Sequence, residues 1–260
     1  MPDITLAQFI DKLRAAQVCV RAGAQTIALS SDKNTIAKVT GDAAATWREE
    51  NAQVAIADPT FGSVVLQPKS LAVIVKASRE LIADSINIDQ ALETSLRNSL
   101  AAELDRVALI GSGVSPEPTG IFYTSGVNSF PGLVLTDYDD FISSMALCWE
   151  DNSPNVSAIV MSPGNFATLA MLKEATTNAP LAKPEVLRDV PILQTTSVGG
   201  DKMVLGDFSQ LIIGIRLSLR IEILREIYAE HYQVAFLASL RADIGVQHAA
   251  SFCKITVSGS

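Results

Sequence analysis

The chain has 260 residues, 48% of them hydrophobic, and a formal net charge of −8. This length suits one domain or two closely joined domains with a packed core. The acidic balance argues against binding of nucleic acid through the chain's own charge, because such proteins show a basic patch or tail. No run of about 18 uncharged apolar residues occurs, so the sequence predicts no membrane span. The start of the chain shows no secretory signal.

The first 46 residues predict a short helix followed by an extended arm. Apolar residues between Ile4 and Val18 recur at roughly helical spacing. Residues 19–46 are poor in large apolar side chains and rich in Ala, Thr, Ser and Gly. We therefore expect them to form short extended pieces of an arm that stays outside the core.

Residues 47–76 predict a projecting pair of strands. The pattern between Glu49 and Val75 indicates two strands, with a turn at the Asp-Pro-Thr-Phe-Gly segment 58–62 and a strand over 71–76. Strand pairs this exposed are only marginally stable alone, so the hairpin implies a partner surface. Trp47 and Phe61 are expected to anchor in a neighbouring subunit, as aromatic residues often do at interfaces. Packing onto the chain's own core is the alternative.

A long amphipathic helix follows this hairpin. Apolar residues recur every four positions from Ile88 to Leu104 and predict a helix over 88–110. A shorter helical segment precedes it at 78–82, with an interruption near 84–87. Gly111 supplies the stop at the carboxyl end of the long helix.

The remainder alternates helices and strands and then becomes strand-rich, which indicates an α+β fold. Helices are expected from 136–140 to about 150 and from 162 to about 173. Strands are expected at 156–161, 190–193, 203–207 and 221–226, and strands or partly helical pieces at 232–240 and 250–257.

No motif of this chain predicts catalysis, a metal or a cofactor. The glycines of segment 111–113 lack the spacing of a phosphate loop, and the segment follows a helix instead of opening one. His231 and His248 have no His or Cys beside them, whereas a metal site needs three or four converging ligands. The aspartates of segment 137–140 stand where a helix begins, and capping explains them better than a cation. The three cysteines are odd in number and far apart, which indicates reduced thiols.

Several segments together resemble the tailed-phage major capsid proteins of the Hong Kong 97 type. The order and spacing of these segments carry the resemblance, which covers nearly the whole chain. The segments are 47–50 (Trp-Arg-Glu-Glu), 75–85, 100–113 (ending Leu-Ile-Gly-Ser-Gly), 117–121 (Glu-Pro-Thr-Gly-Ile), 160–166 and 205–208.

The resemblance implies an α+β, Hong Kong 97-like capsid fold with four parts. Residues 1–40 would be an N-terminal arm and 41–75 an extended loop. Residues 76–118 and 217–258 would form a peripheral domain with the long helix as its spine, and 119–216 an axial domain. The residues expected to contact neighbouring subunits are Trp47, Arg48, Glu49, Glu50, Pro59, Phe61 and Lys69.

The resemblance also implies a structural role and no enzymatic activity. Many copies would assemble as hexamers and pentamers into an icosahedral head around double-stranded DNA, bound without sequence specificity. The chain would belong to the virion, assembled in the host bacterial cytoplasm. Its main partner would be itself, and scaffolding, portal and decoration proteins are further partners that the family implies. An encapsulin-like compartment of the same fold and a soluble α+β enzyme with a scattered site are the alternatives.

Two departures from the namesake of the family matter. The namesake joins a loop lysine covalently to an asparagine of a neighbouring peripheral domain. Here residues 49–67 contain no lysine and residues 226–241 no asparagine, so we expect a shell held by non-covalent contacts. The sequence also starts close to the arm with Met1, which favours a separate scaffold over a removed scaffolding segment.

Overall fold

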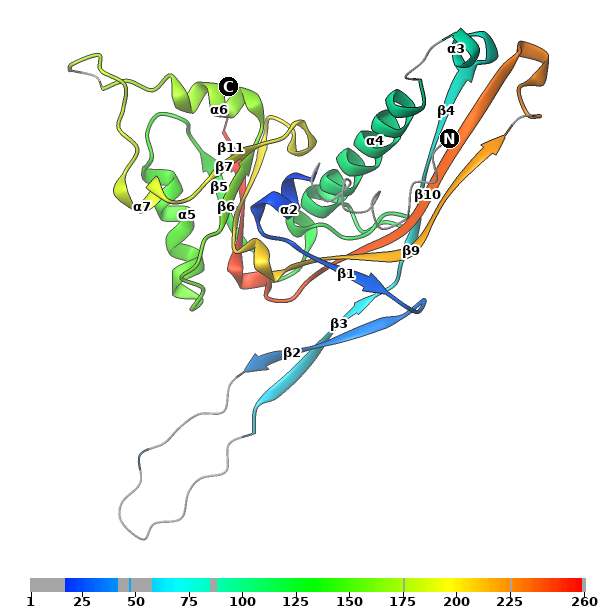
Figure 1. Cartoon of the computed structure of the whole chain (residues 1–260). Coiled ribbons are helices and arrows are strands. Elements are labelled where there is room, and N and C mark those ends of the chain that lie inside the picture. Colours follow the sequence, from blue (N-terminus) through cyan, green and yellow to red (C-terminus); the bar gives the residue numbers. More distant parts are fainter. Residues whose placement is uncertain are drawn as a thin grey trace.

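The computed structural model describes residues 17–41, 47, 58–84, 88–174, 176–224 and 226–258. Its helices and strands form two sheets with helices against them and a separate two-stranded hairpin, which agrees with the predicted α+β class (Figure 1). Of the helices in these ranges, none is both long and apolar enough to cross a membrane.

The first sheet carries the long helix. Its strand order is β1 (Gln25–Leu29), β9 (Leu211–Leu224), β10 (Gln233–Val246) and β4 (Lys69–Ser78). Three helices lie with this sheet: α2 (Val18–Ala22), α3 (Arg79–Asp84) and α4 (Ile88–Ile110). Helix α4 packs beside β4 and β10 (Figure 1). We call the two sheets and their helices the body of the chain.

The predicted helix over 88–110 is confirmed with the bounds of α4. Leu92, Leu96, Leu100 and Leu104 are all buried in the core between the helix and the sheet. Their four-residue spacing places them on one side of the helix, so local periodicity was sufficient to predict the element. The predicted interruption at 85–87 lies outside the described residues.

Gly111 follows the last residue of α4, at a position where the surrounding backbone leaves no room for a side chain. A Cβ atom at this position would lie 2.5 Å from the carbonyl oxygens of both Val107 and Pro118. The amide of Gly120 donates to the carbonyl of Gly111 at 2.9 Å, which brings the returning chain against the end of the helix. The structural interpretation of segment 111–113 is therefore confirmed, and close approach is the reason for the glycine.

The second sheet forms a separate core. Its strand order is β5 (Asn128–Leu133), β11 (Phe252–Val257), β8 (Lys202–Gly206), β6 (Ala158–Met161) and β7 (Ile192–Gln194). Helix α5 (Asp139–Glu150) packs on β5, β8 and β11, while α6 (Pro163–Ala170) and α7 (Glu185–Arg188) follow later in the chain. The five 3-10 helices of the described chain are η1 (Ile121–Tyr123), η2 (Thr196–Val198), η3 (Phe208–Gln210), η4 (Ala229–His231) and η5 (Ala249–Ser251).

Strands β2 (Asn34–Gly41) and β3 (Thr60–Leu66) pair antiparallel and project from the body (Figure 1). The structure has a projecting hairpin, but β3 pairs with β2, which precedes the predicted strand pair of 49–75. The predicted turn at 58–62 is also wrong, because Thr60 and Gly62 lie within β3. Strand β4 does not pair with β3; it joins the first sheet beside β10. Residues 49–57, part of the predicted strand pair, lie outside the described residues.

The prediction that residues 19–46 stay outside the core is wrong for residues 19–29. Cys19 is fully buried, Ala22 and Ala24 are buried with it, and β1 pairs in parallel with β9. Small side chains can fill the narrow space beside a helix and a sheet, so a low content of large apolar residues did not mean exposure. The helix predicted over 4–18 falls mostly on residues that the structure does not describe.

Candidate intersubunit surface

One face of the β2–β3 hairpin is exposed and uncharged. The register sets Ala37 opposite Ser63 and Thr35 opposite Val65, while alternation along β3 puts Phe61 on the same face. The exposed fraction of Phe61 is 71% and that of Val65 is 42%. We call these five residues the outer face of the hairpin. An aromatic ring left this exposed on a strand pair is a candidate contact for another protein surface.

The opposite side of the hairpin is anchored at its root. Leu66 and Ile212 are fully buried, Leu29 is nearly so, and together they form a small apolar cluster. Ile36 and Val64, which are paired across the hairpin, pack against this cluster. The hairpin therefore has one side that the body covers at the root and one side that it leaves free.

The predicted contact residues lie partly on this hairpin. Trp47, with an exposed fraction of 103%, and Phe61 do not pack on the chain's own core, so that alternative is wrong for both. Pro59 is exposed just before β3. Arg48, Glu49 and Glu50 lie outside the described residues.

Lys69 stands apart from the outer face, at the start of β4. Its Nζ donates to the carbonyl of Glu117 at 2.6 Å, so within a single chain it ties β4 to the turn after α4. Contact of any predicted residue with a neighbouring subunit stays a prediction. Sequence reasoning missed Val65 on the outer face, although the alternation in residues 60–66 could have indicated it.

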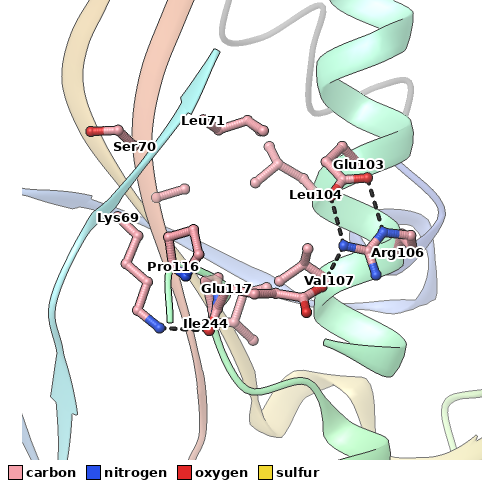
Figure 2. A pocket seen from close by; sticks show the side chains of 12 residues that line it. Lys69, Ser70, Leu71, Glu103, Leu104, Arg106, Val107, Pro116, Glu117 and Ile244 are labelled. Carbon is pink, nitrogen blue, oxygen red and sulfur yellow. Dashed lines mark hydrogen bonds and ion pairs between the residues drawn. The ribbon is translucent and has the colours of Figure 1, made fainter. Parts of the chain in front are cut away.

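A shallow cavity lies where β4, α4 and the turn after α4 meet (Figure 2). Arg106 donates from Nε to Glu103 at 2.9 Å and from Nη2 to the same carboxylate at 2.7 Å. It also donates to Glu117, whose carboxylate accepts from Ser112 as well. The Ser112 hydroxyl and the Arg106 guanidinium hold the pKa of Glu117 below its usual range.

These paired charges give the cavity a structural role. Each of its charged side chains, Lys69, Glu103, Arg106 and Glu117, is engaged with another group of the same wall. The network joins the turn at 111–120 to α4 and β4. These ion pairs and hydrogen bonds hold the start of β4 in place. They do not form a paired nucleophile and base of the kind that covalent catalysis needs.

The buried cysteines and His248 lie outside this cavity. Burial raises the pKa of Cys148 to about 11 and that of Cys253 to about 12, so both thiols stay protonated near neutral pH. His248 Nδ1 lies 2.9 Å from the Ser251 hydroxyl. Within the described ranges, no three His, Cys, Asp or Glu side chains are grouped so that they could hold a metal ion.

Asp137 precedes α5, and Asp139 and Asp140 lie in its first turn, so their position at the start of a helix is confirmed. The N-cap residue itself, Tyr138, makes no side-chain cap hydrogen bond. Asp137 Oδ1 accepts from the amide of Asp139 and Asp140 Oδ2 accepts from the amide of Val134, each at 3.0 Å. Negative charge at the first turn is also favoured by the helix dipole.

A spine helix across one sheet, a second five-stranded sheet and a projecting hairpin together define a known class of fold, that of solved phage capsid chains. The capsid of an empty GTA particle superposes with a TM-score of 0.76 at 19% identity and covers 93% of this chain and 90% of its own. The chain from Mycobacterium phage Cain gives a TM-score of 0.71 at 15% identity, with 99% of both chains covered. At these identities the likeness shows the fold.

The sequence model of the phage capsid family matches residues 1–257, and the chain belongs to that family. The major capsid protein of Klebsiella oxytoca phage phiKO2 is 22% identical over 246 residues, which is 87% of this chain and 58% of the relative. The major capsid protein of Halomonas phage phiHAP-1 is 25% identical over 175 residues, 65% of this chain and 29% of the relative. The chain thus spans 58% and 29% of the lengths of these two relatives. The resemblance to capsid proteins of the Hong Kong 97 type is confirmed.

Proposed function

We propose that the chain is a structural major capsid protein of a tailed phage. Copies assemble as hexamers and pentamers into an icosahedral head that encloses double-stranded DNA, and the protein resides in the virion. The observation that carries this proposal is the outer face of the hairpin, because Phe61 and Val65 on that face are exposed in the described chain. Family membership supplies the kind of partner, which is further copies of the same chain.

The proposed mechanism is cumulative burial between copies. The hairpin of one copy lies over a neighbour, and contacts of this head-to-tail kind can close into rings around a symmetry axis. Residues 1–40 act as the arm, 41–75 as the extended loop, 76–118 with 217–258 as the peripheral domain, and 119–216 as the axial domain. The capsid names of the relatives favour a phage head over an enzyme compartment or a soluble enzyme.

The proposed shell is held by non-covalent contacts. Residues 49–67 offer no lysine for a bond of the kind the family's namesake makes. Mature particles dissolved in detergent should therefore run on a denaturing gel as single chains, and a ladder of linked chains would contradict this.

Electron microscopy of the purified chain tests the function itself. Closed shells or capsomer rings in negative stain are the expected result, and they should pellet as high-mass material with the chain as their main component. Uniform particles of monomer size at high protein concentration would contradict self-assembly by this chain.

A further inference from the structure

Strands β9 and β10 present an ordered set of side chains where the hairpin enters the body. Because alternate residues of a strand point to the same face, three consecutive cross-strand pairs share the face that receives the hairpin. The pairs are Ile212 with Gly245, Gly214 with Asp243, and Arg216 with Arg241.

The two glycines of this set make room for the root of the hairpin. A Cβ atom on Gly214 would lie 2.7 Å from Leu29 Cδ1, and one on Gly245 would lie 2.6 Å from Val64 Cγ1 and 2.8 Å from Leu66 Cδ2. Any larger residue would push these side chains away. The apolar root therefore sits directly against the backbone of both strands.

Asp243 holds the chain as it leaves β3. It is 8% exposed, and its Oδ2 accepts from the amide of Gln67 at 2.6 Å while Oδ1 accepts from the amide of Ile244 at 2.9 Å. A buried carboxylate with two backbone donors is satisfied only while residue 67 stays in place. Displacement of the hairpin root would remove the Gln67 amide and leave the buried carboxylate with only the Ile244 amide as a donor.

Arg216 and Arg241 hold the chain on the other side of the hairpin. Like charges directly opposite each other on paired strands repel. Asp32, in the turn before β2, accepts from both guanidinium groups, with 2.8 Å from Arg241 Nη1. Arg241 Nη2 also donates to the carbonyl of Pro68 at 3.0 Å, so this one side chain reaches both segments that flank the hairpin.

We propose that Asp32, Arg216, Arg241 and Asp243 form a root latch that fixes the direction of the hairpin in the single chain, before a neighbour engages it. One point of attachment would allow the hairpin to swivel about its root, whereas attachment of both flanking segments to one sheet face sets a direction. Single exposed ion pairs contribute little, but here one carboxylate bridges two opposed cations and a buried carboxylate adds a second hold. The purpose of that direction, which is to meet a neighbouring copy, rests on the proposed function.

Pulsed electron paramagnetic resonance tests the latch in the single chain. Spin labels on Ser63→Cys in the hairpin and Ala102→Cys on α4 would report the distance between hairpin and body. Both sites are exposed, and Cys19, Cys148 and Cys253 are all buried, so labelling should be specific. Labelled chains diluted with unlabelled ones, at a concentration where sedimentation shows single chains, exclude distances between copies.

The latch predicts one narrow distance peak for the labelled chain and the loss of that peak in Asp32→Ala. Lys33→Ala is the matched control, since it removes a neighbouring charge of the same turn and should keep the narrow peak. An equally narrow, unshifted peak in Asp32→Ala, with unchanged circular dichroism, would overturn the proposal. This outcome is independent of assembly: absence of shells would count against the proposed function and leave the peak unaffected.

Discussion

Apolar side chains are buried between α4 and the first sheet, whereas they are exposed on the outer face of the hairpin. In the body, Leu96 and Leu100 are each 1% exposed between α4 and the first sheet. On the hairpin, Phe61 is 71% exposed and lies on a face without charge among the described residues. The long helix and the first sheet therefore bury these leucines within one chain, whereas the described residues leave Phe61 largely uncovered.

This difference separates stability from function. Burial of apolar surface is the dominant favourable term in folding, so the stability of the single chain is expected to come from the body. The hairpin root also contributes to the stability of the single chain, because Leu66 is fully buried against β9 and β10. The exposed outer face is expected to contribute little to the stability of the single chain and is available for assembly.

The largest loss of stability should come from the body. Leu100→Ala removes a fully packed side chain from the spine helix and should lower the free energy of unfolding by about 2–5 kcal/mol. Urea unfolding measures this loss. The exposed Ser99→Ala on the same helix is the control, and it should change the free energy of unfolding by no more than about 0.5 kcal/mol. A loss no larger than that of the control would mean that the body is not the rigid unit described.

The root should behave as part of the body. Gly245→Val would place side-chain atoms against Val64 and Leu66 and should lower the free energy of unfolding by about 1–3 kcal/mol. Gly200→Ala is the control, since a Cβ there has no atom within 4 Å. Equal urea midpoints for the two variants would show that the root is not seated as tightly as described.

The outer face should be neutral for the single chain and decisive for assembly. Phe61→Asp should change the free energy of unfolding by less than about 0.5 kcal/mol, because Phe61 is 71% exposed in the single chain. The same change should abolish shells, since it would bury a charge at the proposed contact. Phe61→Leu should retain them, and normal shells from Phe61→Asp, seen by electron microscopy, would break the comparison.

Acid should have the smallest effect on the hairpin, and it acts there through the latch. Arg241 and Arg216 hold the pKa of Asp32 below its ordinary value, so its contribution is present above about pH 3.9 and is lost as the pH falls through the lowered pKa. Burial raises the pKa of Asp243, so Asp243 takes up its proton first as the pH falls.

The narrow distance peak of the labelled chain should therefore persist at about pH 5 and disappear only below the usual range of Asp. Circular dichroism at each pH checks that the body stays folded. A peak that broadens already above the usual range of Asp would assign the hold to Asp243 instead of Asp32, because burial raises the pKa of Asp243.

Local patterns predicted the body better than the contacts that orient the hairpin. The helix over 88–110 followed from apolar spacing within one segment, and strands β4, β6 and β8 followed from short apolar runs. Asp32 and Arg241 lie 209 residues apart, and the parallel pairing of β1 with β9 joins segments that are also far apart in the chain. Nothing in the local sequence specifies such pairings, because they depend on how the whole chain returns to one sheet face.

The turn residues near the hairpin were misleading for a physical reason. Pro59 and Gly62 are typical of turns, but Gly62 lies inside β3 and Pro59 stands just before it. The resemblance to a family predicted the overall architecture, whereas the outer face could be identified only from the register of β2 with β3. The contact role of Trp47, Phe61 and the neighbouring predicted residues stays a prediction.

A cryo-electron microscopy reconstruction of assembled particles tests the central claim most directly. The claim predicts that the side chain of Phe61, 71% exposed in the single chain, is buried against a neighbouring copy in the shell. A reconstruction in which the outer face of the hairpin remains open to solvent in every copy would contradict it.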